Sequence, residues 1–190
     1  MSSEKEKEYN LSLDEVKEIA GRKSIYLVSA DNKYSLVRIF NKGLDTGRDQ
    51  YVIIHYQTGD DNNSRYGHWV GMIIKPKRKM IYYMDSYGIY PDDELEYISY
   101  KYRKKTGQIN RDVGTFLYRA INYFGYKVRY NDDKLQASGD NIGTCGRYVG
   151  LFLRTKVEPE VFASLIRKMG ISTNLKSPDD VVVAMTREII

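Results

Sequence analysis

Two apolar segments flank a short basic turn near the middle of the chain. They run from His68 to Lys75 and from Met80 to Ser86, and Pro76-Lys77-Arg78-Lys79 separates them. Both segments are rich in β-branched, aromatic and other apolar residues, so they predict an antiparallel β-hairpin. Because a hairpin needs further packed elements to be stable, the chain is expected to build a sheet around it.

The register of this hairpin decides which side chains can meet. If the four turn residues are unpaired, Lys75 faces Met80, whereas a tighter turn would pair Lys75 with Arg78. Either register places His68 and Asp85 on the same face, with Cβ atoms about 4.5 to 8 Å apart. That separation allows a hydrogen bond between imidazole and carboxylate. A one-residue bulge would instead put the two side chains on opposite faces.

Other segments predict helices and strands around the hairpin. Ser12 and Glu15 form a capping box before an apolar stripe that Gly21 ends. Further strands are predicted at 51–56 and 125–130, and helices at 92–105, 113–124, 145–153, 159–168 and from Pro178 onward. The mixture predicts an α+β fold with a mixed, mostly antiparallel sheet and a buried central helix. At 190 residues we expect one domain, 1–190.

Composition excludes several kinds of protein. A single cysteine rules out an internal disulfide and a zinc site of several thiolates. No apolar run of about 18 residues is present, and the charged N-terminus is unlike a signal peptide. We therefore expect an intracellular protein without membrane, metal or cofactor. The eighteen tyrosines suit a sheet whose rings fill a core while their hydroxyls reach water.

Cys145 stands where a polar loop enters the apolar helix predicted at 145–153. The free amides and positive dipole end at a helix N-terminus favour a thiolate over a thiol. Gly146 adds no side chain that would obstruct a substrate carbonyl. The alternative is that Cys145 is a small buried core residue, as single cysteines often are.

A histidine, an aspartate and a glutamine could complete a site around this thiol. An aspartate at Asp85 would fix the tautomer of His68, so that the other ring nitrogen could exchange a proton with Cys145. Gln136, nine residues before Cys145, could supply one donor of an oxyanion hole. The alternatives are a structural His–Asp pair and a solvated loop glutamine.

Four short motifs occur in a definite order along the chain. They are Gly67-His68-Trp69-Val70, Met84-Asp85-Ser86, Leu135-Gln136 and Thr144-Cys145-Gly146-Arg147-Tyr148-Val149. This ordered set resembles the adenovirus-type (adenain-like) maturation proteases, which share a fold and active-site order with the SUMO-specific proteases. The Thr-Cys-Gly-Arg segment is similar to the capsid-processing proteases of large DNA viruses and virophages. The resemblance spans about half the chain, from Tyr66 to Leu153.

The resemblance implies a papain-like cysteine protease fold in permuted chain order. It assigns Cys145 as nucleophile, His68 as base, Asp85 as the residue that orients the histidine, and Gln136 to the oxyanion hole. It also implies an endopeptidase, expected as a monomer, that cleaves viral capsid or other structural precursor polypeptides in the virion and the infected host cell cytoplasm. The family prefers small residues, often glycine, before the scissile bond.

Other functions fit parts of the same sequence. The same scaffold could remove a ubiquitin-like modifier or transfer an acyl group. A formal charge of +5 permits nucleic-acid binding, through a strip made by the basic segments 75–79 and 101–105 with their tyrosines, although a charged turn and a solvated helix end are the simpler interpretation. His55 lacks partners at metal-ligand spacing, so we expect a hydrogen-bonded structural histidine.

Overall fold

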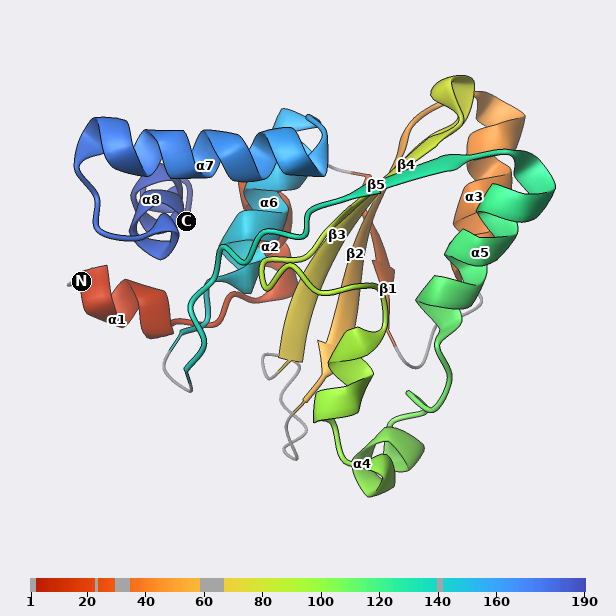
Figure 1. The fold of residues 1–190 in the computed structure, drawn as a ribbon, viewed down its shortest axis with the longest axis horizontal. Helices are drawn as coiled ribbons and strands as arrows, with labels where there is room; N and C mark the ends of the chain where they lie inside the picture. The colour runs from red at the N-terminus through yellow and green to blue at the C-terminus, as the bar shows by residue number, and fades with distance from the viewer. Residues whose placement is uncertain (1–2, 23, 30–34, 59–66, 140–141) are drawn as a thin grey trace.

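The structure, a computed structural model, describes residues 3–22, 24–29, 35–58, 67–139 and 142–190. A five-stranded mixed sheet lies at its centre in the order β1-β2-β3-β4-β5 (Figure 1). The strands β2, β3 and β4 pair antiparallel, and the edge strands β1 and β5 pair parallel with their neighbours. Their bounds are Tyr26–Val28 (β1), Gln50–Gln57 (β2), Gly67–Lys75 (β3), Met80–Met84 (β4) and Lys127–Tyr130 (β5). The predicted mixed sheet is confirmed.

The central hairpin adopts the register with an unpaired turn. Lys75 pairs with Met80 and Gly71 pairs with Met84. One 3-10 turn, Pro76–Arg78, joins the strands, and Lys79 closes it in the left-handed conformation with φ 49°. The alternative pairing of Lys75 with Arg78 is therefore excluded. Because β4 ends at Met84 rather than at Ser86, Asp85 begins the loop that follows the strand.

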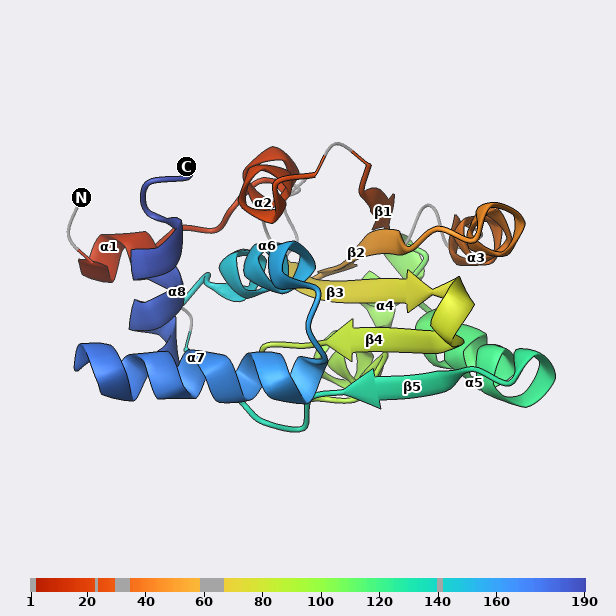
Figure 2. The same cartoon turned by 90° about the horizontal axis from the view of Figure 1, so that it is seen from above.

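Helices cover both faces of the sheet. Figure 2 shows α6, α7 and α8 on one side of the sheet and α3 and α5 on the other. The helices on the first side, together with α2, share one apolar core with the sheet, and α3 and α5 share the second. Their bounds are Ser3–Glu8 (α1), Leu13–Ala20 (α2), Ser35–Thr46 (α3), Tyr100–Lys105 (α4), Asp112–Phe124 (α5), Cys145–Thr155 (α6), Pro159–Thr173 (α7) and Pro178–Thr186 (α8).

The side chains of β3 alternate between two apolar cores, so helices must cover both faces of the sheet. Trp69 and Ile73 belong to the core that α6 completes, whereas Val70 and Met72 belong to the core beneath α3 and α5. Successive strand side chains point to opposite faces, so a strand that is apolar at every position must be buried on both. The result is three layers, with the sheet in the middle.

The helix α6 is the predicted central helix. Every residue from Cys145 to Leu153 is buried. Glycine at position 150 lets α2 approach α6 closely, because a Cβ there would lie 2.5 Å from the Cγ2 of Ile19. The tightly packed α6 therefore holds its first residue, Cys145, at a fixed place against the end of the sheet.

One predicted helix is wrong and several elements were not predicted. The segment 92–105 is not continuous: it forms a 3-10 turn over Asp93–Tyr97 (η3) and a separate α4. Ile98 is buried between them, and Ser99 caps α4 by accepting a hydrogen bond from the amide of Tyr102. The elements α1, β1 and α3 have no counterpart in the sequence prediction.

Within the described ranges, no helix is long and apolar enough to cross a lipid bilayer.

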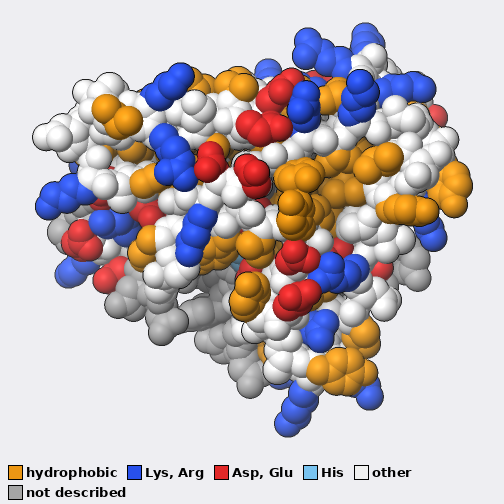
Figure 3. Space-filling model, viewed as in Figure 1, with side chains coloured by type: hydrophobic (Ala, Val, Ile, Leu, Met, Phe, Trp, Pro, Cys, Tyr) orange, Lys and Arg blue, Asp and Glu red, His pale blue; other side chains and the backbone are white. Residues whose placement is uncertain are grey.

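Tyrosines also lie on the surface. Figure 3 shows apolar side chains gathered near the middle of one face, over β5 and the segment that follows β4, with charged side chains around them. Tyr90 of that segment and Tyr130 of β5 pack edge to face, with ring centroids 5.1 Å apart. Tyr97 of η3 is 80% exposed. The tyrosines therefore serve the surface as well as the core.

Candidate active site

His68 and Asp85 are joined by a buried hydrogen bond. The Nε2 atom of His68 lies 3.0 Å from Oδ1 of Asp85. His68 is 3% exposed and Asp85 1% exposed. The predicted meeting of the two side chains on one face of the hairpin is confirmed. Because Asp85 engages Nε2, the Nδ1 atom of His68 remains for another partner.

The electrostatic surroundings of His68 favour a charged imidazole. Burial alone would lower the pKa of His68, but the charge of Asp85 and its hydrogen bond, together with a hydrogen bond and charge at Cys145, raise the pKa well above its usual range. A carboxylate in a desolvated site has this effect on a neighbouring base. Asp85 and Cys145 therefore both lie close enough to His68 to act on the charge of its imidazole.

Cys145 is the first residue of α6 and is 4% exposed. Within the described part of the chain, the backbone amides of Cys145 and Gly146 have no hydrogen-bond acceptor; the amides of Arg147 and Tyr148 both donate to the carbonyl of Thr144. Amides that lack an acceptor among the described residues at the start of a buried helix favour negative charge there. The predicted position of the thiol at a helix N-terminus is confirmed.

Gln136 is held beside the loop that follows β4. Its Oε1 accepts a hydrogen bond of 2.7 Å from the hydroxyl of Ser86, and its backbone amide donates to the carbonyl of the same residue at 2.9 Å. Its Nε2 donates to the hydroxyl of Tyr87 at 3.2 Å and to the carbonyl of Ile142 at 3.0 Å. No hydrogen bond joins Gln136 directly to Cys145 within the described ranges.

The three consecutive residues 85–87 therefore connect the imidazole of His68 with the side-chain amide of Gln136. Asp85 binds His68, Ser86 binds Gln136, and Tyr87 contacts both: its ring stacks on His68 with centroids 4.8 Å apart. The segment folds back because the amide of Tyr87 donates to Oδ1 of Asp85 at 2.7 Å. The segment 85–87 thus holds both His68 and Gln136 in place.

Glycine at position 88 completes this turn. Its φ of 68° is in the left-handed region, and a Cβ there would lie 2.7 Å from the carbonyl carbon of Asp133. Both the backbone conformation and the close approach favour glycine. The turn therefore packs closely against the segment that leads to Gln136.

Asn131 and Asp179 support the site from outside the predicted set. Asn131 brackets Asp85: its Oδ1 accepts from the amide of Asp85 at 3.1 Å, and its Nδ2 donates to the carbonyl of Asp85 at 2.6 Å. Asp179, at the start of α8, accepts from the hydroxyl of Thr144 at 2.5 Å and from the amide of Ala137 at 3.0 Å. Asp179 thereby ties the residue before Cys145 to the residue after Gln136.

His55 is a buried ring in the core. Its ring packs on Trp69 with centroids 4.0 Å apart, but its buried Nε2 has no hydrogen-bond partner among the described residues. Burial, followed by the charge of His68, lowers the pKa of His55 to about 4. The ring is therefore an uncharged structural part of the core, although its Nε2 lacks the expected hydrogen bond among the described residues.

The four predicted side chains are all inaccessible to a large molecule. Cys145, His68, Asp85 and Gln136 are each less than 5% exposed. Tyr87 lies partly exposed above the imidazole. A substrate can reach the thiol only if part of this cover moves.

Over the described residues, no group of three or more His, Cys, Asp or Glu side chains is suited to hold a metal ion.

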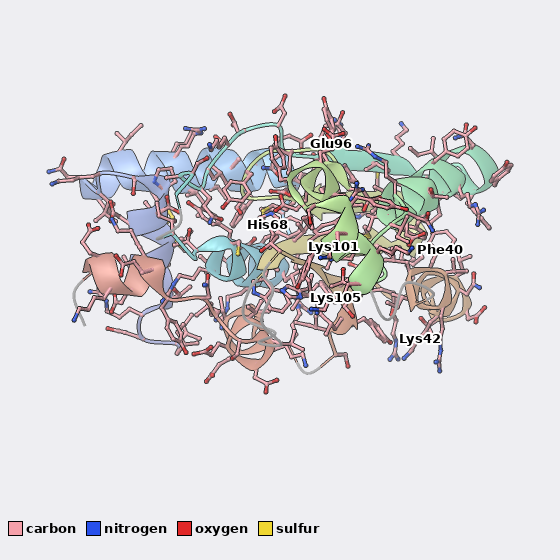
Figure 4. The ribbon with its side chains drawn as sticks, turned by 90° about the horizontal axis from the view of Figure 1, so that it is seen from below. Phe40, Lys42, His68, Glu96, Lys101 and Lys105 are labelled. Atoms are coloured by element: carbon pink, nitrogen blue, oxygen red, sulfur yellow. The ribbon has the colours of Figure 1, made fainter. Side chains whose placement is uncertain are left out.

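The two basic segments do not form one strip. The turn at 75–79 and α4 lie at opposite ends of the molecule (Figure 1). Lys75 is also buried, with its Nζ 3.6 Å from Asp49. Figure 4 shows Lys101 and Lys105 of α4 on the same side of the molecule as His68. Nucleic-acid binding through α4 alone stays a prediction.

Comparison with known proteins finds a relative in sequence and a slight likeness among solved structures. The uncharacterized protein V9 of Sputnik virophage is 30% identical over 148 residues, which cover 70% of this chain and 81% of that protein. No protein-family model matches the chain. Among solved structures, the chain is similar to the SUMO protease Ulp1 with its catalytic cysteine oxidized to a sulfonic acid, at 14% identity and a TM-score of 0.37, over 95% of this chain and 79% of that one.

Proposed function

The chain belongs to the family of the Sputnik virophage protein V9, and we propose that it is a cysteine peptidase. In this proposal Cys145 is the nucleophile, His68 the base and acid, Asp85 the residue that orients the histidine, and Gln136 a donor of the oxyanion hole. The observation that carries it is the buried imidazole of His68, bonded through Nε2 to Asp85 and raised in pKa by Asp85 and Cys145. A histidine between a carboxylate and a helix-terminal thiol is suited to acyl transfer.

The first half of the proposed reaction forms an acyl-enzyme. An imidazolium beside the sulfur and the free amides at the start of α6 stabilise a thiolate at Cys145. The thiolate attacks the peptide carbonyl carbon and forms a C–S bond. The backbone amide of Cys145 and the Nε2 of Gln136 then donate to the oxyanion. When the C–N bond breaks, His68 gives its proton to the leaving amine.

The second half consumes water. Neutral His68 takes a proton from water, which attacks the thioester carbonyl and releases the carboxylic acid and the thiol of Cys145. Asp85 keeps the same ring nitrogen protonated throughout, so only the other nitrogen exchanges protons. Before this cycle begins, Gln136 must exchange its hydrogen bond to Tyr87 for one to the oxyanion.

We propose that the substrates are viral capsid or other structural precursor polypeptides, cleaved internally during assembly of virions in the infected cell. The virophage relative and the ordered motifs around His68, Asp85, Gln136 and Cys145 support this choice. They favour an endopeptidase of virion maturation over removal of a ubiquitin-like modifier or transfer of an acetyl group.

The test is co-expression of the chain with the capsid proteins of its source. We expect shortened capsid proteins with the parent chain and full-length ones with Cys145→Ala, which keeps the buried position small and apolar. Cys145→Ser provides a second inactive variant of nearly the same shape. Equal processing by parent and Cys145→Ala would refute the proposal.

Two further incubations separate the competing activities. Purified chain is mixed with modifier conjugates or with acetyl-CoA and an acceptor protein. Release of modifier, or acetylation of the acceptor, in place of capsid cleavage would assign the same residues to one of those reactions. Salt-sensitive DNA binding with no reaction at Cys145 would instead favour the nucleic-acid-binding alternative.

A further inference from the structure

A pocket of about 310 Å³ lies beside the candidate active site. Its lining consists of aromatic, aliphatic and charged side chains, namely Tyr87, Ile89, Glu94, Tyr97, Lys134 and Ser138. Tyr87 belongs to the pocket and to the active site at once, since its ring stacks on His68 and its hydroxyl accepts from Gln136. A polypeptide that reaches Cys145 past Tyr87 would therefore also reach this pocket.

Glu94 is the unusual member of the lining. It lies on η3 and is only 9% exposed. Among the described residues, none forms a hydrogen bond or ion pair with its carboxylate. Burial raises the pKa of Glu94, and the charge of His68 opposes that effect. A buried carboxylate without a partner is costly, so it indicates a position that a ligand completes.

The other lining residues suggest which group would complete it. No ion pair joins Lys134 to Glu94 among the described residues; the ammonium of Lys134 donates a hydrogen bond to the hydroxyl of Ser138. The rings of Tyr87 and Tyr97 and the side chain of Ile89 offer apolar and aromatic surface for an aliphatic stem. A stem that ends in a cation matches such a pocket, since the cation can pair with the carboxylate and contact the rings.

We propose that this pocket binds a lysine or arginine side chain of the polypeptide that the chain cleaves. The inference rests on the proposed peptidase function and adds a requirement for one basic residue at a fixed distance from the scissile bond. Glu94 acts as a specificity-determining residue that touches substrate. A charge-assisted hydrogen bond in a desolvated pocket supports a preference of about tenfold or more for a basic residue over a neutral one.

Glu94 could have a different role, because its carboxylate also faces the charge on His68. In that case it would support the imidazolium and would act equally on every substrate. The two roles differ in what a neutral replacement changes: the choice among peptides, or the rate for all of them.

The experiment profiles cleavage of a peptide library prepared from a digested proteome. Four chains are compared by mass spectrometry of the new termini: the parent, Cys145→Ala, Glu94→Gln and Glu96→Gln. Glu96 is a matched control because it also lies on η3, yet its side chain is 69% exposed and pairs with Arg111 (Figure 4). Glu94→Gln keeps the shape of the side chain and removes its charge.

We expect the parent and Glu96→Gln to enrich lysine and arginine at one position of the cleaved peptides. Glu94→Gln should lose that enrichment about tenfold or more, so that basic and neutral peptides are cleaved at similar rates. No basic enrichment with the parent, or a uniform loss of rate in Glu94→Gln, would overturn the pocket assignment. Identical products from the parent and Cys145→Ala would instead refute the peptidase proposal, and the pocket assignment with it. If Glu94→Gln does not fold, the profile of the parent alone decides.

Discussion

Tyr87 lies over the imidazole of His68, with ring centroids 4.8 Å apart and ring planes inclined by 28°. Its hydroxyl accepts a hydrogen bond from Nε2 of Gln136, and the charge of Cys145 is among the causes, after burial, that raise the pKa of Tyr87. The side chain of Tyr87 therefore contacts two of the four predicted site residues, His68 and Gln136, and lies close to a further one, Cys145. Since the reactive atoms of His68 and Cys145 are buried, we expect Tyr87 to control access to them.

Replacing Tyr87 should expose the thiol. We expect Tyr87→Ala to react with iodoacetamide several-fold faster than the parent at neutral pH, because the reagent no longer has to displace the ring. The measurement is the rate of Cys145 modification followed by mass spectrometry. Tyr118→Ala is the control, since Tyr118 is 61% exposed on α5. A rate for Tyr87→Ala equal to that of the control would mean that the ring does not cover the thiol.

The two histidines should titrate far apart. Burial lowers the pKa of His55 to about 4, whereas Asp85 and Cys145 raise the pKa of His68 well above its ordinary value near 6.5. In a proton NMR titration, one imidazole signal should shift near pH 4 and the other only well above pH 6.5. Asp85→Asn should bring the second midpoint down, because the replaced carboxylate was a principal cause of the shift. Two midpoints near 6.5 would contradict the buried His68–Asp85 pair.

The helix cap and the central hairpin could be predicted from short stretches of sequence. The capping box of Ser12 and Glu15 is present as predicted, and the hairpin adopts one of the two registers that the sequence allowed. The proximity of His68 and Asp85 then followed from strand geometry. These features need only neighbours in sequence or a single pair of strands, so one sequence is enough to predict them.

Features that depend on distant packing were missed. The sequence pattern typical of a charged helix runs through position 98, so it does not predict that the helix is interrupted there. The interruption accompanies burial of the Ile98 side chain. The role of Asp179 depends on bringing α8 against the loop before Cys145, which no local spacing indicates. For Tyr87 a signal existed: an aspartate two residues before it and a glycine one residue after it are typical of a tight turn.

Folding stability should decrease in acid because of His55. Its pKa is about 4 in the folded chain and near 6.5 when unfolded. The unfolded state therefore binds more protons between these values, and stability falls as the pH drops through them. From pH 7 to pH 5 this effect amounts to about 2 kcal/mol. His55→Phe keeps an aromatic ring against Trp69 and should lose less stability over that range.

Urea unfolding of the parent and His55→Phe at both pH values provides the measurement. His68 acts with the opposite sign: its pKa is raised in the folded chain, so its contribution is fully present below about pH 6.5 and is lost as the pH rises through the folded pKa. Comparing the two chains isolates His55 because both contain His68. Equal losses of stability would mean that His55 is not held neutral by the fold.

Asp179 should position the nucleophile although it lies on α8, outside the candidate active site. Its carboxylate joins Thr144, the neighbour of Cys145, to Ala137, the neighbour of Gln136. Asp179→Asn replaces one acceptor oxygen with a donor, which leaves at least one of these groups unpaired at a cost of about 1 to 3 kcal/mol. We expect kcat for a cleaved peptide to fall about tenfold or more while KM changes little, because the oxyanion donors are misplaced rather than the substrate contacts.

The control is Asp180→Asn on the same helix, because Asp180 pairs with Lys7 at 3.0 Å and accepts from the hydroxyl of Ser177 at 2.8 Å, away from Cys145. If Asp179 only stabilises α8, both variants should melt lower and keep the parent kcat at temperatures where they are folded. A loss of kcat confined to Asp179→Asn, in a folded chain, would separate positioning from stability. It would also explain why a buried carboxylate is retained at this place, where an apolar residue would fill the space without needing three hydrogen-bond donors from Thr144, Ala137 and Tyr148.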